Sequence, residues 1–174
     1  VNVFHVTKRR LHQALDMDVL VHLNGYYQIN PELDIDYDVM HFAARLMEGR
    51  DADNPDRIAA WQKAIDLYRG PFLQGHSDSW ILDRRADFRS GYLQALTAMA
   101  QHRLSEDRPE FALGLYLKAV SEDSTRDDIH REIMRLYTSL GRRSEAAAHF
   151  KKLSDSLKGE VSPETRALYD EIMA

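Results

Sequence analysis

The amino-acid sequence predicts an all-α protein, a right-handed array of helical pairs, preceded by a short helix and a β-hairpin. Three observations lead to this prediction. Apolar residues recur at helical spacing along most of the 174 residues, with glycine and proline between the segments. Part of the chain superposes on itself at a shift of 34 residues. Near the N-terminus, two β-rich runs flank an Asn-Gly pair, which is the strongest local signal for a two-residue hairpin turn.

The composition excludes several classes of protein. Hydrophobic residues make up 44% of the chain and charged residues 29%, which is typical of a soluble globular protein. No apolar run is long enough to span a bilayer, and the N-terminus lacks the layout of a signal peptide, so we expect a cytoplasmic protein with no membrane partner. Because cysteine is absent, disulfides and thiolate sites are excluded.

The first expected element is a helix over residues 3–15, with Asn2 as its N-cap. Its apolar side chains recur at helical spacing, at Phe4, Leu11, Ala14 and Leu15. The polar side chains fall largely on the other side, at His5, Lys8, Arg9 and His12. The chain has a net charge of −5, yet its first twelve residues contain three consecutive cations and no acid. Such a run on a helix is usually a solvated face, so its context decides its meaning.

A β-hairpin over residues 19–29 is the second expected element. Asn24-Gly25 separates its two strands, and both residues tolerate the positive φ angles of a type I′ turn. In this register Leu23 faces Tyr26, and Leu20 faces Ile29. These are the only strands that we expect.

A polar connector over residues 31–36 then precedes a series of helices, whose boundaries follow from glycine, proline and capping residues. We expect helices to begin near Tyr37, Pro55, Trp80, Pro109, Ser144 and Pro163. Ser162 is the expected cap of the helix at Pro163, and Ser124 or Thr125 is the expected cap of a further helix that ends at Gly141. The residues expected to stop them are Gly49, Gly70, Leu104, Ser121, Gly141 and Gly159.

The 34-residue repeat indicates the type of helical pair. Ala112, Tyr116 and Ala119 superpose on Ala146, Phe150 and Leu153. The spacing small-x3-aromatic-x2-small is typical of the second helix of a tetratricopeptide repeat, where the small residue lets two helices approach closely. In the first helix one copy has the expected small residue, Ala100, but the other has Met134. We therefore expect two degenerate repeats, with a third further upstream that contains Ala60, Ala64 and Leu67.

The motifs that suggest chemistry all lack an essential part. Residues 70–77 resemble a phosphate loop, but a helix precedes them and His76 replaces the lysine. Residues 51–56 resemble the start of a calcium loop without its glycine and bidentate glutamate. The eight histidines form no H-E-x-x-H pattern. We expect no catalysis, no metal and no cofactor; an enzyme whose site forms from residues scattered in the sequence is a rival hypothesis, which predicts turnover or a tight small-molecule ligand.

The basic helix and the hairpin together suggest DNA binding. A basic helix followed directly by a hairpin is typical of a helix that enters the major groove, with a wing against the adjacent backbone. The cations would hold phosphates, and His5, Thr7 or Arg9 would reach base edges.

Two stretches of the chain resemble known domains. Residues 2–15 and 19–30, NVFHVTKRRLHQAL and VLVHLNGYYQIN, resemble the recognition helix and wing that end a winged-helix DNA-binding domain of the response-regulator type. Residues 60–150 are similar to the bacterial transcriptional activator domain, an all-helical tetratricopeptide-like module that follows such a winged helix in antibiotic-pathway activators. The most specific pieces are the YRGPFL run at residues 68–73, with Trp80 and Arg84.

The resemblance implies two domains: residues 1–30 as the recognition helix and wing of a truncated winged helix, and residues 36–174 as a bacterial transcriptional activator domain. It implies DNA contacts from Lys8, Arg9 and His12 on the helix and from Asn24 and Gly25 at the wing. We expect a fragment of a transcriptional regulator that binds DNA poorly as it stands, because the earlier winged-helix elements are missing.

The expected partners are DNA, through the complete winged helix, RNA polymerase or other regulator domains, and a second copy in a homodimer. The alternative is a tetratricopeptide-type interaction scaffold without DNA binding, in which the basic helix is a solvated face.

Overall fold

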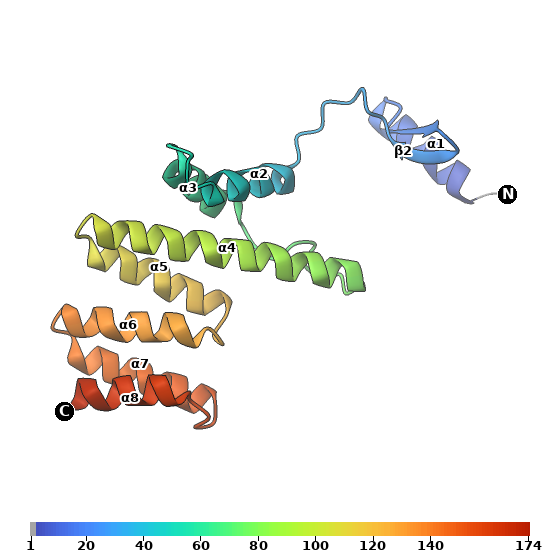
Figure 1. Ribbon diagram of the computed structural model, residues 1–174. Helices are drawn as coiled ribbons and strands as arrows, with labels where there is room; N and C mark the ends of the chain where they lie inside the picture. The colour runs from blue at the N-terminus through green and yellow to red at the C-terminus, as the bar shows by residue number, and fades with distance from the viewer. Residues whose placement is uncertain (1–2) are drawn as a thin grey trace. The chain divides into compact units, whose positions relative to one another are not determined.

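The computed structural model describes residues 3–174, so the expected cap Asn2 lies outside the described residues. The chain divides into two compact units, unit 1 up to Tyr37 and unit 2 from Asp38 to Ala174. The described residues form eight helices and one two-stranded sheet, which confirms the all-α prediction with its N-terminal hairpin (Figure 1). Among these residues, no helix is long and apolar enough to cross a membrane.

Unit 1 consists of α1 (Val3–Leu15), β1 (Leu20–Leu23) and β2 (Tyr26–Ile29). Asn24 and Gly25 have φ angles of 53° and 85°, as a type I′ turn requires. The two strands are antiparallel, and the predicted register is confirmed, with Leu20 opposite Ile29 and Leu23 opposite Tyr26. None of the described residues of unit 1 is buried, because one helix and one hairpin cannot enclose a core.

Unit 2 is a series of seven helices in which each helix packs on the next along the chain, as in a repeat protein (Figure 1). They are α2 (Asp38–Arg50), α3 (Arg57–Leu67), α4 (Ser79–Ser105), α5 (Pro109–Glu122), α6 (Asp127–Ser139), α7 (Arg143–Ser156) and α8 (Pro163–Met173). Helix α8 closes the series by packing on both α6 and α7.

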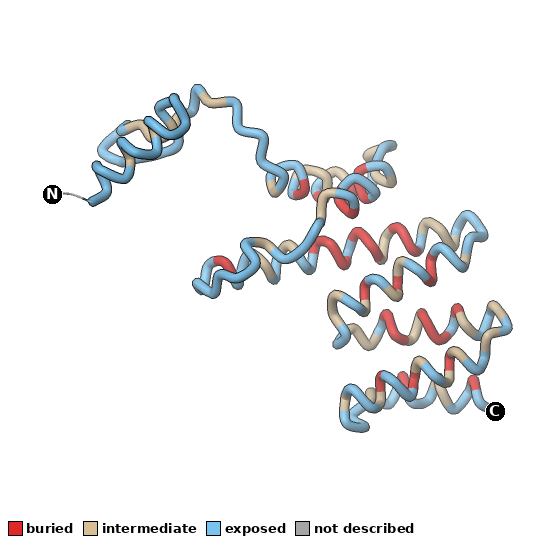
Figure 2. Tube along the Cα trace, turned by 180° about the vertical axis from the view of Figure 1, so that it is seen from behind, coloured by how far each residue is buried: buried red, intermediate tan, exposed pale blue. Residues whose placement is uncertain are grey.

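The residues that define the 34-residue repeat form the core of unit 2. All six superposed positions, Ala112, Tyr116, Ala119, Ala146, Phe150 and Leu153, are at most 8% exposed. Buried positions recur along the facing sides of successive helices (Figure 2). Met134, which departs from the small residue of the pattern, is fully buried in a separate cluster with Phe150 and Ile172. The larger side chain therefore belongs to an apolar cluster that α6, α7 and α8 share.

Several predicted helix boundaries are wrong, and tertiary packing explains the clearest case. Gly49 does not stop α2 but lies inside it, where a Cβ atom would come within 2.5 Å of the Trp61 indole. The helix therefore needs glycine at this position for the close approach of α3. Helix α3 begins at Arg57 rather than at Pro55, and α7 begins at Arg143, one residue before the predicted start.

The predicted cap of α6 is wrong as well. This helix begins at Asp127, its N-cap position is Arg126, and no side chain caps it. Thr125 instead donates its hydroxyl and its backbone N–H to Asp123, which forms a local turn before the helix. The predicted cap of α8 is confirmed, because Ser162 Oγ accepts a hydrogen bond from the Thr165 N–H at 3.2 Å.

A pair of histidines makes the stability of unit 2 depend on pH. The Nδ1 atom of His130 lies 2.8 Å from Nε2 of His149, and its Nε2 lies 3.1 Å from the Ser124 carbonyl oxygen. Burial lowers the pKa of both rings, that of His149 to about 4, where the charge of His130 and Lys152 adds to the effect. The His149 ring is therefore neutral in the folded protein at pH 6.5.

We expect the free energy of unfolding to fall by about 2 kcal/mol between pH 6.5 and pH 4.5, allowing for the partial exposure of His149. Below pH 6.5 the unfolded chain binds protons that the folded chain excludes, so acid favours unfolding until the pH reaches the lowered pKa. Urea denaturation at several pH values measures this. His149→Gln keeps a hydrogen-bond donor for His130 but does not titrate, so it should flatten the dependence of the unfolding free energy on pH. If this dependence is unchanged in the variant, His149 is not its cause.

Candidate nucleic-acid interface

The hairpin of unit 1 is held against α1 through Tyr27. The Tyr27 ring lies 4.7 Å from the Phe4 ring, centroid to centroid, and Lys8 Nζ lies 5.1 Å from the Tyr27 centroid. The Tyr27 hydroxyl is 3.4 Å from His5 Nδ1. This places the Lys8 ammonium at the junction of helix and hairpin, where the aromatic face attracts it.

His12 ties the end of α1 to the start of β1. Its Nε2 atom accepts a hydrogen bond from the Leu20 N–H at 3.1 Å, so the ring proton resides on Nδ1, which lies 2.7 Å from the Asp18 carboxylate. Both ring nitrogens are thus engaged inside unit 1, and the side chain is only 14% exposed. In this arrangement His12 positions the helix against the hairpin.

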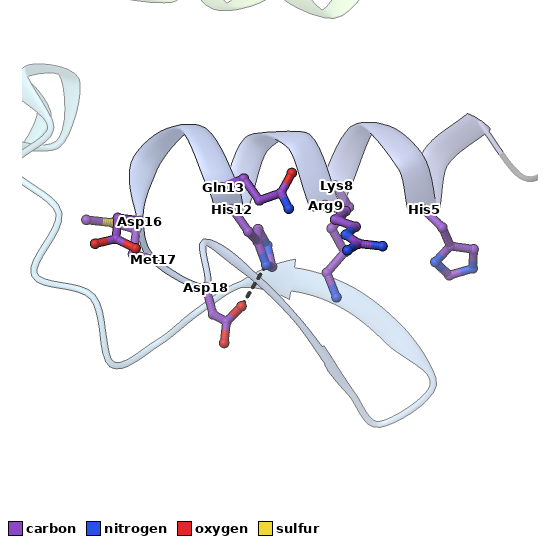
Figure 3. A pocket seen from close by; sticks show the side chains of 8 residues that line it. All are labelled: His5, Lys8, Arg9, His12, Gln13, Asp16, Met17 and Asp18. Atoms are coloured by element: carbon purple, nitrogen blue, oxygen red, sulfur yellow. Dashed lines mark ion pairs between the residues drawn. The ribbon is translucent and has the colours of Figure 1, made fainter.

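Four of the predicted site residues line one hollow on α1 (Figure 3): His5, Lys8, Arg9 and His12. Their spacing of three and four residues places them on one side of the helix. Thr7 does not line this hollow and is exposed elsewhere on α1. Asn24 and Gly25 form the tip of the hairpin, and neither has a hydrogen bond or ion pair with a described residue of α1.

The charges on α1 differ in how far they are neutralised. Within residues 3–174, Arg9 and Arg10 have no ion pair or hydrogen bond, so their charge is available to a ligand. The acidic side chains of Asp16 and Asp18 line the same hollow at the C-terminal end of the helix (Figure 3). The positive charge is therefore concentrated in the middle of α1, at residues 8–10.

Two members of this surface were missed by sequence reasoning. Gln13 lines the hollow four residues after Arg9, and this spacing could have identified it. Tyr27 is the residue that orients Lys8, and no pattern in the sequence marks which aromatic of the hairpin faces the helix. No group of three or more His, Asp or Glu side chains in the described part of the chain could hold a metal ion.

The YRGPFL run of unit 2 leads into a loop organised by an arginine. Arg85 Nε donates to the carbonyl of Phe72 at 2.9 Å, and a terminal nitrogen donates to the carbonyls of Leu73 and His76. The loop thus directs carbonyl oxygens toward a cation, the opposite polarity to a phosphate loop, which presents N–H groups. Arg85, rather than the neighbouring Arg84, performs this role.

The sequence of unit 2 identifies its family. The profile of the bacterial transcriptional activator domain matches residues 37–173. The chain belongs to this family. The match begins next to the boundary between the two units, so the bacterial transcriptional activator domain corresponds to unit 2. This confirms the family resemblance of the helical region, and it identifies unit 2 as a domain of the transcription-regulator type.

A comparison with solved structures supports the fold of the bacterial transcriptional activator domain. The chain is similar to the C-terminal domain, which contains tetratricopeptide repeats, of a Plasmodium falciparum protein described as FK506-binding. The TM-score is 0.55 at 16% sequence identity, over 79% of this chain and 92% of that chain. This likeness confirms the tetratricopeptide-like arrangement of helices. A comparison with curated protein sequences finds no match.

Proposed function

We propose that this chain acts in a cytoplasmic transcriptional regulator, in which unit 1 contributes the recognition helix and wing and unit 2 binds partner proteins. The observation that carries the DNA-binding half is the row of cations on α1 beside a type I′ hairpin, with Arg9 unpaired among the described residues. Lys8 and Arg9 would hold phosphates, while His5 and Gln13 on the same side of α1 would reach base edges.

The apolar surface of unit 1 supports this proposal. Side chains of α1 that a compact domain would bury are exposed among the described residues, from 37% for Leu11 to 77% for Val3. In a winged helix, other helices cover this side and leave the opposite side of the recognition helix to DNA. His12 links α1 to the start of the hairpin by accepting a hydrogen bond from the Leu20 N–H.

The function of unit 2 follows from its family. A tetratricopeptide-like array presents extended binding surfaces, so we assign to it recruitment of RNA polymerase, of another regulator domain or of a second copy, without bond chemistry. Binding and positioning would be the whole mechanism.

Selection from a random DNA pool tests this function. The protein, expressed from its complete reading frame, is incubated with the pool, and the bound DNA is amplified and sequenced over several rounds. We expect one sequence of several base pairs to be enriched, with an affinity that decreases steeply with salt. If no sequence is enriched, the result would contradict sequence-specific DNA binding and favour the alternative, an interaction scaffold without DNA binding.

A further inference from the structure

A groove in unit 2 gathers three arginines from distant parts of the chain. Arg50 ends α2, Arg57 begins α3 and Arg126 precedes α6. Helix α4 supplies the floor with polar side chains at successive turns, Ser90, Gln94, Thr97 and Gln101. None of the described residues that line it is acidic. We call this surface the arginine groove.

Two hydrogen-bond donors of the arginine groove are buried without an acceptor. The Nε–H of Arg57 and the indole Nε1–H of Trp61 have no partner within the described part of the chain. Trp61 lines the groove and is only 2% exposed, so solvent does not replace a protein acceptor. Unpaired buried donors destabilise the free protein, and a ligand that supplies acceptors removes this penalty.

Two other arginines of the arginine groove already make hydrogen bonds within the protein. Arg50 Nε donates to Gln94 Oε1 at 2.8 Å, and Arg126 makes a two-point contact with Asp128 at 2.9 and 2.7 Å. The guanidinium of Arg57, in contrast, forms no hydrogen bond or ion pair with any described residue. A ligand must therefore bring acceptor oxygens with negative charge, which carboxylates offer to a guanidinium in matching geometry.

The shape of the surface favours a chain over a single ion. Thr97 and Gln101 also line an adjoining hollow, which continues past Tyr116 to α6. There Arg131 and Arg135 line it together with Asp128 and Glu132. Unit 2 has more acidic than basic residues, and this balance opposes a long polyanion such as duplex DNA. A short acidic peptide places its charge locally against the arginines without that repulsion.

We propose that the arginine groove binds an acidic peptide segment of a partner protein. One carboxylate accepts hydrogen bonds from Arg57 and Trp61, and a second lies toward Arg50. This peptide-binding proposal rests on the proposed role of unit 2 in binding partner proteins, and it states the chemical class of the partner. The proposed DNA binding by unit 1 does not depend on it.

Titration of the full chain with a blocked hexaglutamate peptide tests the proposal. The chain has two tryptophans, so its NMR spectrum contains two indole N–H resonances, and Trp80→Phe assigns them. Trp80 lies at the start of α4, is 58% exposed and serves as the internal control. We expect the Trp61 resonance to move downfield with hexaglutamate and the Trp80 resonance to stay. Hexaglutamine should move neither.

Variants of the groove locate the binding. Arg57→Gln and, separately, Arg50→Gln should weaken the hexaglutamate affinity at least tenfold by calorimetry, while Arg57→Lys keeps part of it. Arg143→Gln, which removes an exposed arginine of α7, should leave the affinity unchanged. A Trp61 resonance that does not shift with hexaglutamate, or an affinity of both groove variants equal to that of the unmodified chain, would overturn the proposal. A shift with inorganic phosphate but not with hexaglutamate would overturn it in favour of a phosphorylated ligand.

Discussion

Gly49→Ala is expected to lower the free energy of unfolding by about 3 kcal/mol. The added Cβ atom would lie 2.5, 2.7 and 2.8 Å from three ring atoms of Trp61. The indole is rigid and buried, so α3 must move away from α2 to admit the methyl group. Helix propensity alone predicts the opposite sign, because alanine is favoured over glycine inside a helix by about 1 kcal/mol.

Gly114→Ala is the matched control for Gly49→Ala. Gly114 also lies inside a helix, α5, but nothing is within 4 Å of its added Cβ atom. This variant should gain stability by about 1 kcal/mol or less. Urea denaturation of both variants measures the contrast. If the two substitutions shift the midpoint in the same direction, the close approach of α2 and α3 at Gly49 does not limit stability.

Asp127→Ala should cost about 3 kcal/mol and loosen α8. The Asp127 carboxylate accepts hydrogen bonds from Ser162 Oγ and Thr165 Oγ1, each at 2.7 Å, and forms an ion pair with Arg131. Thr165 is fully buried and also accepts from Arg131 at 3.1 Å. Removing the carboxylate leaves these groups unpaired where α8 begins.

Asp128→Ala provides the control for Asp127→Ala, because it removes the adjacent acid from the same first turn of α6. The Asp128 carboxylate is 54% exposed and pairs with Arg126, so its loss should cost under about 1 kcal/mol. Hydrogen exchange of α8 amides together with urea denaturation separates local loosening from global unfolding. Equal effects of the two variants would show that the first-turn charge matters and the contacts of Asp127 do not.

The role of Asp127 also has a pH signature. Burial acts to raise the pKa of its carboxyl, but the hydrogen bonds from Ser162 and Thr165 and the charge of Arg131 lower the pKa overall. The folded state therefore holds the ionised form more strongly than the unfolded state does. This contribution is fully present above the ordinary pKa of 3.8 and is lost as the pH falls below it.

Local patterns predicted the elements whose causes are local. The Asn24-Gly25 turn fixed both the hairpin and its register, and the buried repeat positions of α5 and α7 followed from their spacing. Gly49 and the start of α6 were mispredicted for a different reason. The role of Gly49 depends on an indole twelve residues later, and the polar residues before α6 bond to Asp123 instead of capping the helix.

The candidate surfaces also contain features that local sequence patterns predict and features that depend on tertiary packing. The spacing of His5, Lys8, Arg9 and His12 was sufficient to place them on one side of α1. The inward orientation of the His12 ring depends on Asp18 and the Leu20 amide, which no pattern in the sequence connects to it. The arginine groove combines residues from α2, α3 and the approach to α6, so only the packed structure brings its unpaired donors together.

The salt dependence of DNA binding by Lys8→Ala/Arg9→Ala tests most directly whether α1 holds DNA. On the sequence enriched by selection, the slope of log affinity against log salt should become shallower by about 1.8, because about 0.9 is lost for each phosphate contact. Lys151→Ala/Lys152→Ala, which removes an exposed basic pair from α7, should keep the original slope. Full affinity with an unchanged slope in the α1 variant would contradict DNA binding by this helix.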